Sequence, residues 1–309
     1  MKVLVTGGAG FIGSHVVDML LENGHEVVVV DDLSTGRRSN LNPAAKFYQL
    51  DIRSPEMEAV FAAERPEVID HHAAQMDVRR SMVDPIFDAD VNILGSIKLA
   101  QLAMKYGVRK FIHISSGGAA YGEPVYLPCD EGHPVQPLCP YGASKYTFEL
   151  YLYLFKVNYG LDYTVIRYPN VYGPRQDPRG EAGVVAIFTG KMLRGLPVTI
   201  NGDGEQVRDY VYVSDCARAN LMVLEAGGGR VFNLGYGVGT TVNQIFAHLK
   251  ELIGYALDAN YGPAKAGETY RIYLDARRAK AELGWDATIE LADGLNKTVV
   301  YLKKELAEG

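Results

Sequence analysis

Val3-Leu-Val-Thr-Gly-Gly-Ala-Gly-Phe-Ile-Gly13 is the stretch that decides the fold. A β-branched apolar run leads into glycines spaced Gly8-x-Gly10-x-x-Gly13, and apolar residues at helical spacing follow. Glycine lets the chain turn sharply and lets a pyrophosphate approach the backbone without meeting a Cβ. A helix N-terminus behind the turn offers N–H groups to the phosphates. We therefore predict a strand, a tight turn and a helix that bind a dinucleotide; the alternative is a glycine turn in an unrelated α/β protein.

A second apolar run, Glu26-Val-Val-Val-Val30, ends in Asp31-Asp32. An acid at the tip of the second strand, about 20 residues after the glycines, accepts hydrogen bonds from the adenosine ribose. Because Asp31 would repel a 2′-phosphate, the sequence favours NAD over NADP. Arg37 and Arg38 leave NADP as a minority alternative.

The composition is that of an ordinary globular protein. The chain has 309 residues, of which 48% are hydrophobic and 22% charged, enough for one large domain or two lobes. A net charge of −6 offers no basic surface for nucleic acid or an anionic membrane. We see no apolar run that could span a bilayer, and Lys2 leads straight into a strand, so we expect no cleaved signal.

The three cysteines, Cys129, Cys139 and Cys216, are odd in number and have no C-x-x-C spacing. This pattern argues against a disulfide framework and indicates a reducing cytoplasm.

Strand and helix patterns alternate up to about residue 167, which predicts a doubly wound parallel sheet of the Rossmann type over residues 1–170. The strand-like runs are Lys2–Thr6, Glu26–Val30, Phe47–Leu50, Val68–His71, Phe111–Ser115 and Tyr163–Arg167. Long helical patterns cover about Asp88–Tyr106 and Tyr141–Tyr159. Ligands of such sheets bind at the carboxyl ends of the strands.

After about Asn170 the alternation loosens, which predicts a smaller α/β lobe over 171–309 from which some segments return to the main sheet. Candidate strands are Val198–Ile200, Asp209–Val213 and Arg230–Asn233. Candidate helices lie near Gly183–Leu193, Ser214–Leu224, Val242–Leu252 and Ala276–Leu283. With no low-complexity linker between them, the two parts should pack closely.

Two stretches after the third and fourth strands suit the floor of a cofactor site. Asp51 and Ile52 would lie near an adenine, or would belong to the start of the next helix. His71 and His72 point to opposite sides of a strand, so we expect no metal site there. The small residues that follow, Ala73 and Ala74, suit a flat surface under a cofactor.

The fifth strand ends in Ser115-Ser116, and Tyr141 and Lys145 follow at the start of an apolar helix. Residues four apart on a helix share one face. A lysine ammonium and a cationic nicotinamide both favour a phenolate, so the pair makes a general base for an alcohol. Either serine hydroxyl could hold the substrate oxygen. The alternative is a helix-surface pair without chemistry.

Together these motifs resemble the extended short-chain dehydrogenase/reductase family. The matching residues are Thr6–Gly13, Asp31, Asp51-Ile52, His72–Ala74, Asn92, Ser115-Ser116 and Tyr141–Lys145. Residues 167–175, 202–215, 232–235 and 283–285 resemble the nucleotide-sugar branch, and the UDP-glucose 4-epimerases most of all.

The resemblance implies 4-epimerisation of a UDP-hexose by transient oxidation at C4, with tightly held NAD. Tyr141 would take the proton, while Lys145 would hold the nicotinamide ribose and lower the tyrosine pKa. Rival activities are an NDP-sugar 4,6-dehydratase or reductase, and a non-catalytic dinucleotide sensor. Gly117 and Gly118 stand where a dehydratase needs an acid pair, and a sensor does not need Tyr141 with Lys145.

The resemblance also assigns binding residues. For NAD they are Gly7, Gly10, Phe11, Ile12, Gly13, Asp31, Asp32, Ser34, Thr35, Gly36, Asp51, Ile52, His72, Ala73, Ala74, Asn92, Tyr141, Lys145 and Tyr168. For the UDP-sugar they are Ser116, Gly117, Tyr141, Asn170, Val185, Arg208, Tyr210, Lys265, Glu268 and Ile272.

The fork of Arg208 suits a diphosphate, although a salt bridge to Asp209 or Asp215 is the alternative. Lys265 and Glu268 stand where the branch carries an arginine and an acid, so a lysine there keeps the charge and loses the fork.

Two positions depart from the family pattern. Gly117 replaces a serine or threonine four residues before Tyr121, so we transfer the hydroxyl role to Ser116, with Ser115 as the alternative. Ile272 stands where some members have a tyrosine at the floor of the sugar pocket. The smaller side chain leads us to hypothesise that UDP-N-acetylglucosamine is accepted as well as UDP-glucose.

The family pairs two long helices per subunit in a homodimer. Here these would be the patterns at 88–106 and 141–159, but their apolar faces could equally belong to the core.

Overall fold

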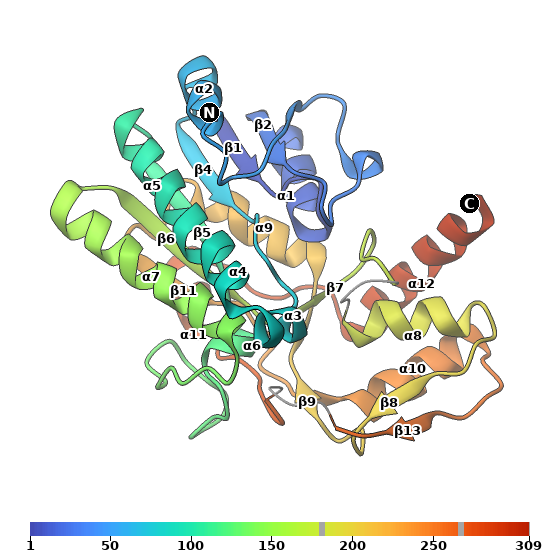
Figure 1. Ribbon diagram of the computed structural model, residues 1–309. Coiled ribbons are helices and arrows are strands. Elements are labelled where there is room, and N and C mark those ends of the chain that lie inside the picture. The colour runs from blue at the N-terminus through green and yellow to red at the C-terminus, as the bar shows by residue number, and fades with distance from the viewer. Residues whose placement is uncertain (179–182, 265–268, 309) are drawn as a thin grey trace.

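The computed structural model describes residues 1–178, 183–264 and 269–308, and within them seven parallel strands form the central sheet (Figure 1). Their order is β11-β6-β5-β4-β1-β2-β3. The strands are β1 (Lys2–Thr6), β2 (Glu26–Asp31), β3 (Lys46–Gln49), β4 (Val68–His71), β5 (Lys110–Ser116), β6 (Asp162–Tyr168) and β11 (Arg230–Asn233). The order reverses between β1 and β4, and ligands of open α/β sheets bind at such a reversal.

Helices cover both faces of the sheet, which confirms the predicted fold class. One face carries α1 (Phe11–Glu22), α9 (Val213–Val223) and α11 (Arg277–Leu283). The other carries α2 (Met57–Glu64), α5 (Ser96–Lys105) and α7 (Pro140–Tyr159). Successive strand residues alternate between the two cores: Val3 and Val5 face α1, whereas Leu4 faces α5 and α7. Burial on both faces explains why these strands are continuous apolar runs.

A smaller α/β unit lies beside the sheet around its own core (Figure 1). Its helices are α8 (Val184–Met192), α10 (Val242–Ile253) and α12 (Leu291–Glu308). Its strands form pairs: β7 (Asn170–Tyr172) with β10 (Tyr210–Tyr212), β8 (Thr199–Asn201) with β13 (Asn260–Gly262), and β9 (Val207–Arg208) with β12 (Thr240–Thr241). Helix α12 was not predicted from the sequence, although Leu295, Val299 and Leu302 are buried at helical spacing.

Two segments from the second half of the chain belong to the main sheet. The candidate strand Arg230–Asn233 is β11, which pairs with β6, and the candidate helix near 214–224 is α9, which packs on α1. No helix among residues 1–178, 183–264 and 269–308 is long and apolar enough to cross a membrane.

The helical pattern predicted over about 88–106 is confirmed, but the segment is not one regular α-helix. The segment consists of α4 (Pro85–Ala89), a π-helical turn η2 (Asp90–Gly95) and α5. The Ser96 hydroxyl donates to the Asn92 carbonyl at 2.7 Å, and the Asn92 side chain is held by Gln75. These contacts widen the helix at a point that simple periodicity does not reveal. π-Turns inside helices often mark functional sites.

Candidate active site

The glycine turn after β1 has no room for side chains at Gly7, Gly8 or Gly13. A Cβ on Gly13 would lie 2.3 Å from the Gly7 carbonyl oxygen, and Gly7 has φ +71°. The start of α1 therefore lies directly over the end of β1. Gly10 is the N-cap of α1, and no side chain caps the helix, so its first N–H groups are left for a ligand.

Asp31 stands at the tip of β2, as predicted, and holds the glycine turn in place. Its Oδ2 accepts from the Ala9 N–H at 3.0 Å and its Oδ1 from the Leu33 N–H at 2.8 Å. Burial raises the pKa of this carboxyl, and the two N–H donors oppose that effect. Next to it, Asp32 accepts from the N–H and the hydroxyl of Ser34. A Cβ on Gly36 would lie 2.7 Å from Asp31 Oδ1, so the loop closes tightly on the acid.

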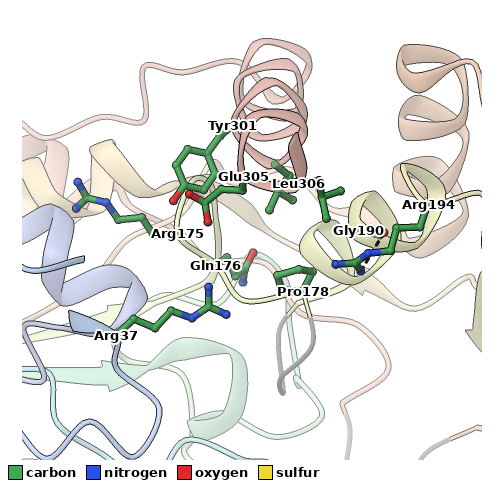
Figure 2. A pocket seen from close by; sticks show the side chains of 10 residues that line it. Arg37, Arg175, Gln176, Pro178, Gly190, Arg194, Tyr301, Glu305 and Leu306 are labelled. Carbon is green, nitrogen blue, oxygen red and sulfur yellow. Dashed lines mark hydrogen bonds between the residues drawn. The ribbon is translucent and has the colours of Figure 1, made fainter. Parts of the chain in front are cut away.

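Residues 175–177, which follow β7, are tied to the loop after β2 and to α1 by arginines. Arg37 forms an ion pair with Asp177, and Arg175 lies 2.7 Å from Asp18 of α1. Between these arginines and α12 lies a cavity of about 390 Å³, which Tyr301 also lines (Figure 2). Because Arg37 and Arg175 are already paired with acids, we read this region as a junction between the two parts of the molecule.

Side-chain hydrogen bonds hold the carboxyl end of β4, which lies between β1 and β5. The Ala73 N–H donates to Thr6 Oγ1 at 3.3 Å, and Thr6 Oγ1 lies 2.7 Å from His71 Nδ1. His72 points to the other face, where its Nε2 lies 3.0 Å from Asp70 Oδ1. Within the described residues, no three His, Cys, Asp or Glu side chains gather as a metal site would require.

Tyr141 and Lys145 occupy the first turns of α7, directly after the loop from β5. Pro140 opens the helix, and the N–H of Gly142 donates to the sulfur of Cys139 at 3.5 Å. A Cβ on Gly142 would lie 2.3 Å from the Ala119 carbonyl oxygen, so the helix start packs against the short helix α6 (Gly117–Ala120). Tyr141 is half-buried, and Lys145 is 4% exposed.

Burial works against the charged forms of both groups. It raises the pKa of Tyr141 to about 12, against a hydrogen bond from Ser116 that lowers it. It lowers the pKa of Lys145 to about 8, against the negative charges of Asp88 and Glu149. The phenol of the protein alone therefore stays protonated at neutral pH, and a further positive charge is needed to make it a base.

The two serines at the end of β5 point to opposite faces, and this distinguishes their roles. The Ser115 hydroxyl donates to Glu149 Oε1 at 2.6 Å inside the core, whereas Ser116 bonds to the Tyr141 phenol. Of the two serines, Ser116 is therefore the one whose hydroxyl lies beside the phenol. Ser115, the alternative given above, is buried at 2% exposure and serves the core.

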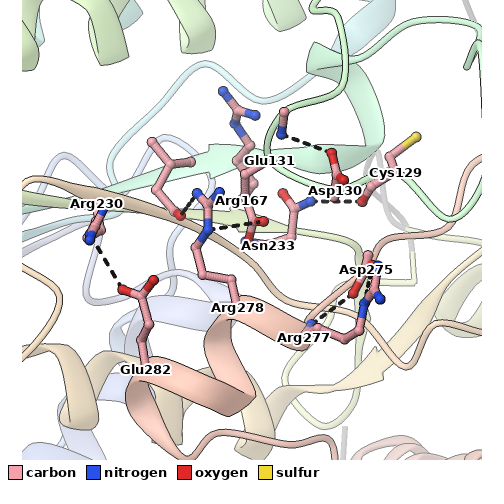
Figure 3. A network of polar contacts seen from close by, with 12 residues as sticks. Cys129, Asp130, Glu131, Arg167, Arg230, Asn233, Asp275, Arg277, Arg278 and Glu282 are labelled. Carbon is pink, nitrogen blue, oxygen red and sulfur yellow. Dashed lines mark hydrogen bonds and ion pairs between the residues drawn. The ribbon is translucent and has the colours of Figure 1, made fainter.

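Glu149 belongs to a buried polar network that sequence reasoning missed. Arg167 donates to both of its carboxylate oxygens, at 3.0 and 2.6 Å, and also to the Tyr121 hydroxyl at 2.8 Å. The Tyr121 hydroxyl donates to Asn233 Oδ1, which continues the network to β11. Asn233 Nδ2 in turn donates to the Cys129 carbonyl at 2.9 Å (Figure 3). The available signal was a lone acid four residues after Lys145 in an apolar helix. The network fixes β5, β6, β11 and α7 to one another.

Leu274 explains the glycine at position 117. A Cβ on Gly117 would lie 2.4 Å from Leu274 Cδ1, so the leucine occupies the space of the missing serine or threonine. Ile272 is 2% exposed and packs with Leu274, Tyr121 and Cys129. The two departures from the family pattern thus lie in one small apolar cluster beside the site.

Asn170 lies close to Ser116, as a substrate site requires. A Cβ on Gly118 would be 3.6 Å from Asn170 Oδ1 and 4.0 Å from Ser116 Oγ. Arg208 lies on β9, and its Nη1 donates to the carbonyls of Val207 and Tyr270. The alternative was a salt bridge from Arg208 to Asp209 or Asp215. Asp209 instead accepts from backbone N–H groups, and Asp215 pairs with Arg218.

Several predicted binding residues have buried side chains. Those at least nine-tenths buried include Asp31, Ile52, Asn92, Lys145, Tyr168, Val185, Tyr210 and Ile272. The Asn92 amide is bonded to Gln75, Asp88 and Ser144, and the Tyr168 hydroxyl accepts from Asn220. Asp51 pairs with Arg53 at 2.6 Å and is not the N-cap of α2. Lys265 and Glu268 lie outside the described residues.

Comparison with known proteins agrees with this geometry. Residues 3–235 match the model of the NAD dependent epimerase/dehydratase family. The chain belongs to this family. It is 45% identical over 311 residues to the UDP-glucose 4-epimerase of Mycolicibacterium smegmatis, covering 99% of each chain.

Two solved structures of the family are close to this one. The UDP-glucose 4-epimerase of Thermotoga maritima, crystallised with UDP-glucose, is 55% identical with a TM-score of 0.98, covering 99% of this chain and 100% of that one. The Thermus thermophilus UDP-glucose 4-epimerase in complex with NAD is 43% identical with a TM-score of 0.94, covering 98% and 99%.

The described residues fit the dinucleotide of an NAD dependent family. The turn lacks side chains where a pyrophosphate must approach, and the uncapped start of α1 faces it. Arg37 is paired with Asp177, and Arg38 donates to Gln49 at 2.6 Å, so both arginines of the NADP alternative are engaged. The acid at the ribose position and the engaged arginines favour NAD.

Proposed function

We propose that this chain is a UDP-hexose 4-epimerase that interconverts UDP-glucose and UDP-galactose. The observation that carries the proposal is the Tyr141 phenol, bonded to Ser116 at the carboxyl end of β5 and one helical turn from Lys145. The glycine turn lies at the same edge of the sheet, two strands away. The UDP-glucose 4-epimerases of T. maritima and M. smegmatis, similar over nearly their whole length, support the choice of sugar.

In this proposal each residue has a defined task. Bound NAD supplies the hydride acceptor, and later the donor, at the sugar C4. Tyr141 takes the proton of the 4-hydroxyl and returns it to the same oxygen after the 4-keto sugar has turned over in the site, and Ser116 orients that oxygen. The Lys145 ammonium holds the nicotinamide ribose and stabilises the phenolate. Asn170 and Arg208 bind the nucleotide end of the substrate.

The residues beside Ser116 favour epimerisation over dehydration. A 4,6-dehydratase needs an acid pair to act on C5 and C6, and Gly117 and Gly118 stand in its place. Glu123, the next acid along the chain, accepts from the Tyr270 N–H. The acid–base groups left at this point are Tyr141 and Ser116, which suffice for reversible oxidation at one carbon.

Replacing Tyr141 tests the proposal directly. We expect Tyr141→Phe to lower the kcat for UDP-galactose formation by about 10³-fold, because it removes the general base. NAD should stay bound at wild-type stoichiometry. Tyr159→Phe, at the exposed end of the same helix, is the matched control. Product resolution by chromatography gives the rates, and Tyr141→Phe with more than a tenth of wild-type activity would contradict the mechanism.

The two serines should give opposite results. Ser116→Ala removes the hydroxyl beside Tyr141, and we expect kcat to fall by about 10²-fold at unchanged stability. Ser115→Ala breaks a buried bond to Glu149, and we expect the free energy of unfolding to fall by about 1.5 kcal/mol with kcat nearly unchanged. Turnover and denaturant unfolding of both variants check this. Equal losses of turnover in the two variants would contradict a catalytic role for Ser116 and a structural role for Ser115.

We infer that the sugar pocket also accepts the 2-acetamido form, because Ile272 is smaller than the tyrosine found in other members. Ile272→Tyr should lower kcat/KM for UDP-N-acetylglucosamine relative to UDP-glucose by tenfold or more. Both sugars are assayed on the same preparation, and thermal unfolding verifies that the larger side chain has not disrupted the cluster with Leu274. Unchanged selectivity would count against the hypothesis.

We infer a homodimer through α7 and its neighbours. Exposed apolar side chains gather there: Leu150, Tyr153, Leu154 and Val157 on α7, with Ile86 on α4 and Leu94 on η2. Exposed apolar groups of this kind mark interfaces, and self-complementary patches give two-fold dimers. In sedimentation, wild type should behave as a dimer and Leu154→Asp as a monomer. Leu257→Asp, in the smaller lobe, is the control; a monomeric wild type at micromolar concentration would exclude the dimer.

We place the protein in the cytoplasm, because all three cysteines are buried free thiols, which a reducing compartment preserves. Recovery of the native protein from an extracellular fraction would contradict this location.

A further inference from the structure

Asp88 carries a buried carboxylate that the mechanism above does not use. It lies on α4 and is 1% exposed. Its Oδ1 accepts from Gln75 Nε2 at 2.9 Å and from Asn92 Nδ2 at 3.2 Å. Its Oδ2 is buried and has no hydrogen-bond partner among the described residues. A carboxylate removed from water in this way is costly unless a positive charge lies near it.

The positive charge that faces Asp88 is that of Lys145. Asp88 is the acid that most strongly opposes the effect of burial on the lysine pKa. The other groups around the ammonium are Glu149 on the same helix, His71 on β4 and His113 on β5. Glu149 is already bound by Arg167, and burial lowers the pKa of both histidines well below its usual value, so they are neutral.

Asp88 is also linked by hydrogen bonds to the turn that carries Tyr141. The amide of Asn92, which donates to Asp88, also donates to Ser144 Oγ at 3.1 Å. The Ser144 hydroxyl donates to the carbonyl of Tyr141 at 3.0 Å. The same acid raises the pKa of the Tyr141 phenol, as does the neighbouring thiol Cys139. One carboxylate therefore acts on both members of the pair, through its charge and through its contacts.

We propose that Asp88 is a positioning residue of the Tyr141–Lys145 pair. Its charge keeps Lys145 an ammonium, and its hydrogen bonds hold the first turn of α7. This inference rests on the proposed function, because it assigns Asp88 to the site that function uses.

Asp88→Asn tests the charge alone, since asparagine keeps the size and an acceptor oxygen. Without the anion the ammonium loses its proton more easily and the phenol ionises more easily. Both limbs of the pH profile of kcat should therefore move to lower pH, the alkaline limb by about 1 unit. The pH above which the affinity for NAD declines, measured by calorimetric titration, should move in the same direction, and this readout does not depend on turnover.

Asp84→Asn is the matched control. Asp84 lies one turn earlier as the exposed N-cap of α4, and asparagine caps a helix equally well. Solvent screens its charge, so both limbs should stay in place. Ser144→Ala breaks the hydrogen-bond chain but leaves the charge, and should lower kcat without moving either limb.

The outcomes distinguish the role of Asp88 from the proposed function. A uniform loss of kcat in Asp88→Asn, with both limbs and the NAD profile unmoved, would make Asp88 a structural residue only and overturn the proposal. If Tyr141→Phe is inactive while Asp88→Asn matches wild type, the Asp88 inference fails alone. If Tyr141→Phe is active, the proposed function itself fails. Should Asp88→Asn not fold, the smaller neutral variant Asp88→Ser gives the same test.

Discussion

The contact between Gly13 and the carbonyl of Gly7 sets the rest of the molecule in place. Since no Cβ separates them, α1 starts directly above the end of β1, and its free N–H groups point to the carboxyl edge of the sheet. Parallel pairing then aligns Thr6 with His71 and carries the edge across β4 to β5, where Ser116 ends the strand. A dinucleotide that starts on the glycine turn reaches Tyr141 only by crossing β4.

Buried charge is the second constraint on the site. Lys145, Glu149, Arg167 and Asp88 are all at least nine-tenths buried, yet only Glu149 and Arg167 form a direct pair. That pair neutralises itself and serves the framework. Asp88 and Lys145 form no such direct pair, so burial lowers the pKa of the ammonium and the charge of Asp88 only opposes that effect. A buried lysine without a direct ion pair responds to the charges around it, as groups at functional sites often do.

Much of the fold was predictable, because strands buried on both faces leave continuous apolar runs at their true positions. The glycine turn, Asp31 and the Tyr141–Lys145 spacing also carry local signals that need no tertiary information. The π-turn at Asp90–Gly95 was not predictable, because the side chains of Asn92 and Ser96 at this point contact Gln75 and His71, which lie far from them in the sequence. Gly117 could not be understood without Leu274, which lies 157 positions later in the sequence and fills its space. Buried partners such as Asp88 leave no periodic trace.

The arginine junction has a mechanical consequence. Arg37 directly follows Gly36, which lies against Asp31, and forms an ion pair with Asp177. Arg175, which stands two residues before Asp177, forms an ion pair with Asp18 of α1. Two ion pairs thus link the loop after β2 and helix α1 to residues 175–177. A movement of this loop away from residues 175–177 would lengthen the Arg37–Asp177 ion pair, so a movement of the loop is coupled to the smaller unit. Both ion pairs are partly exposed to solvent and individually weak, so we expect the coupling between the two parts to decrease as the ionic strength rises.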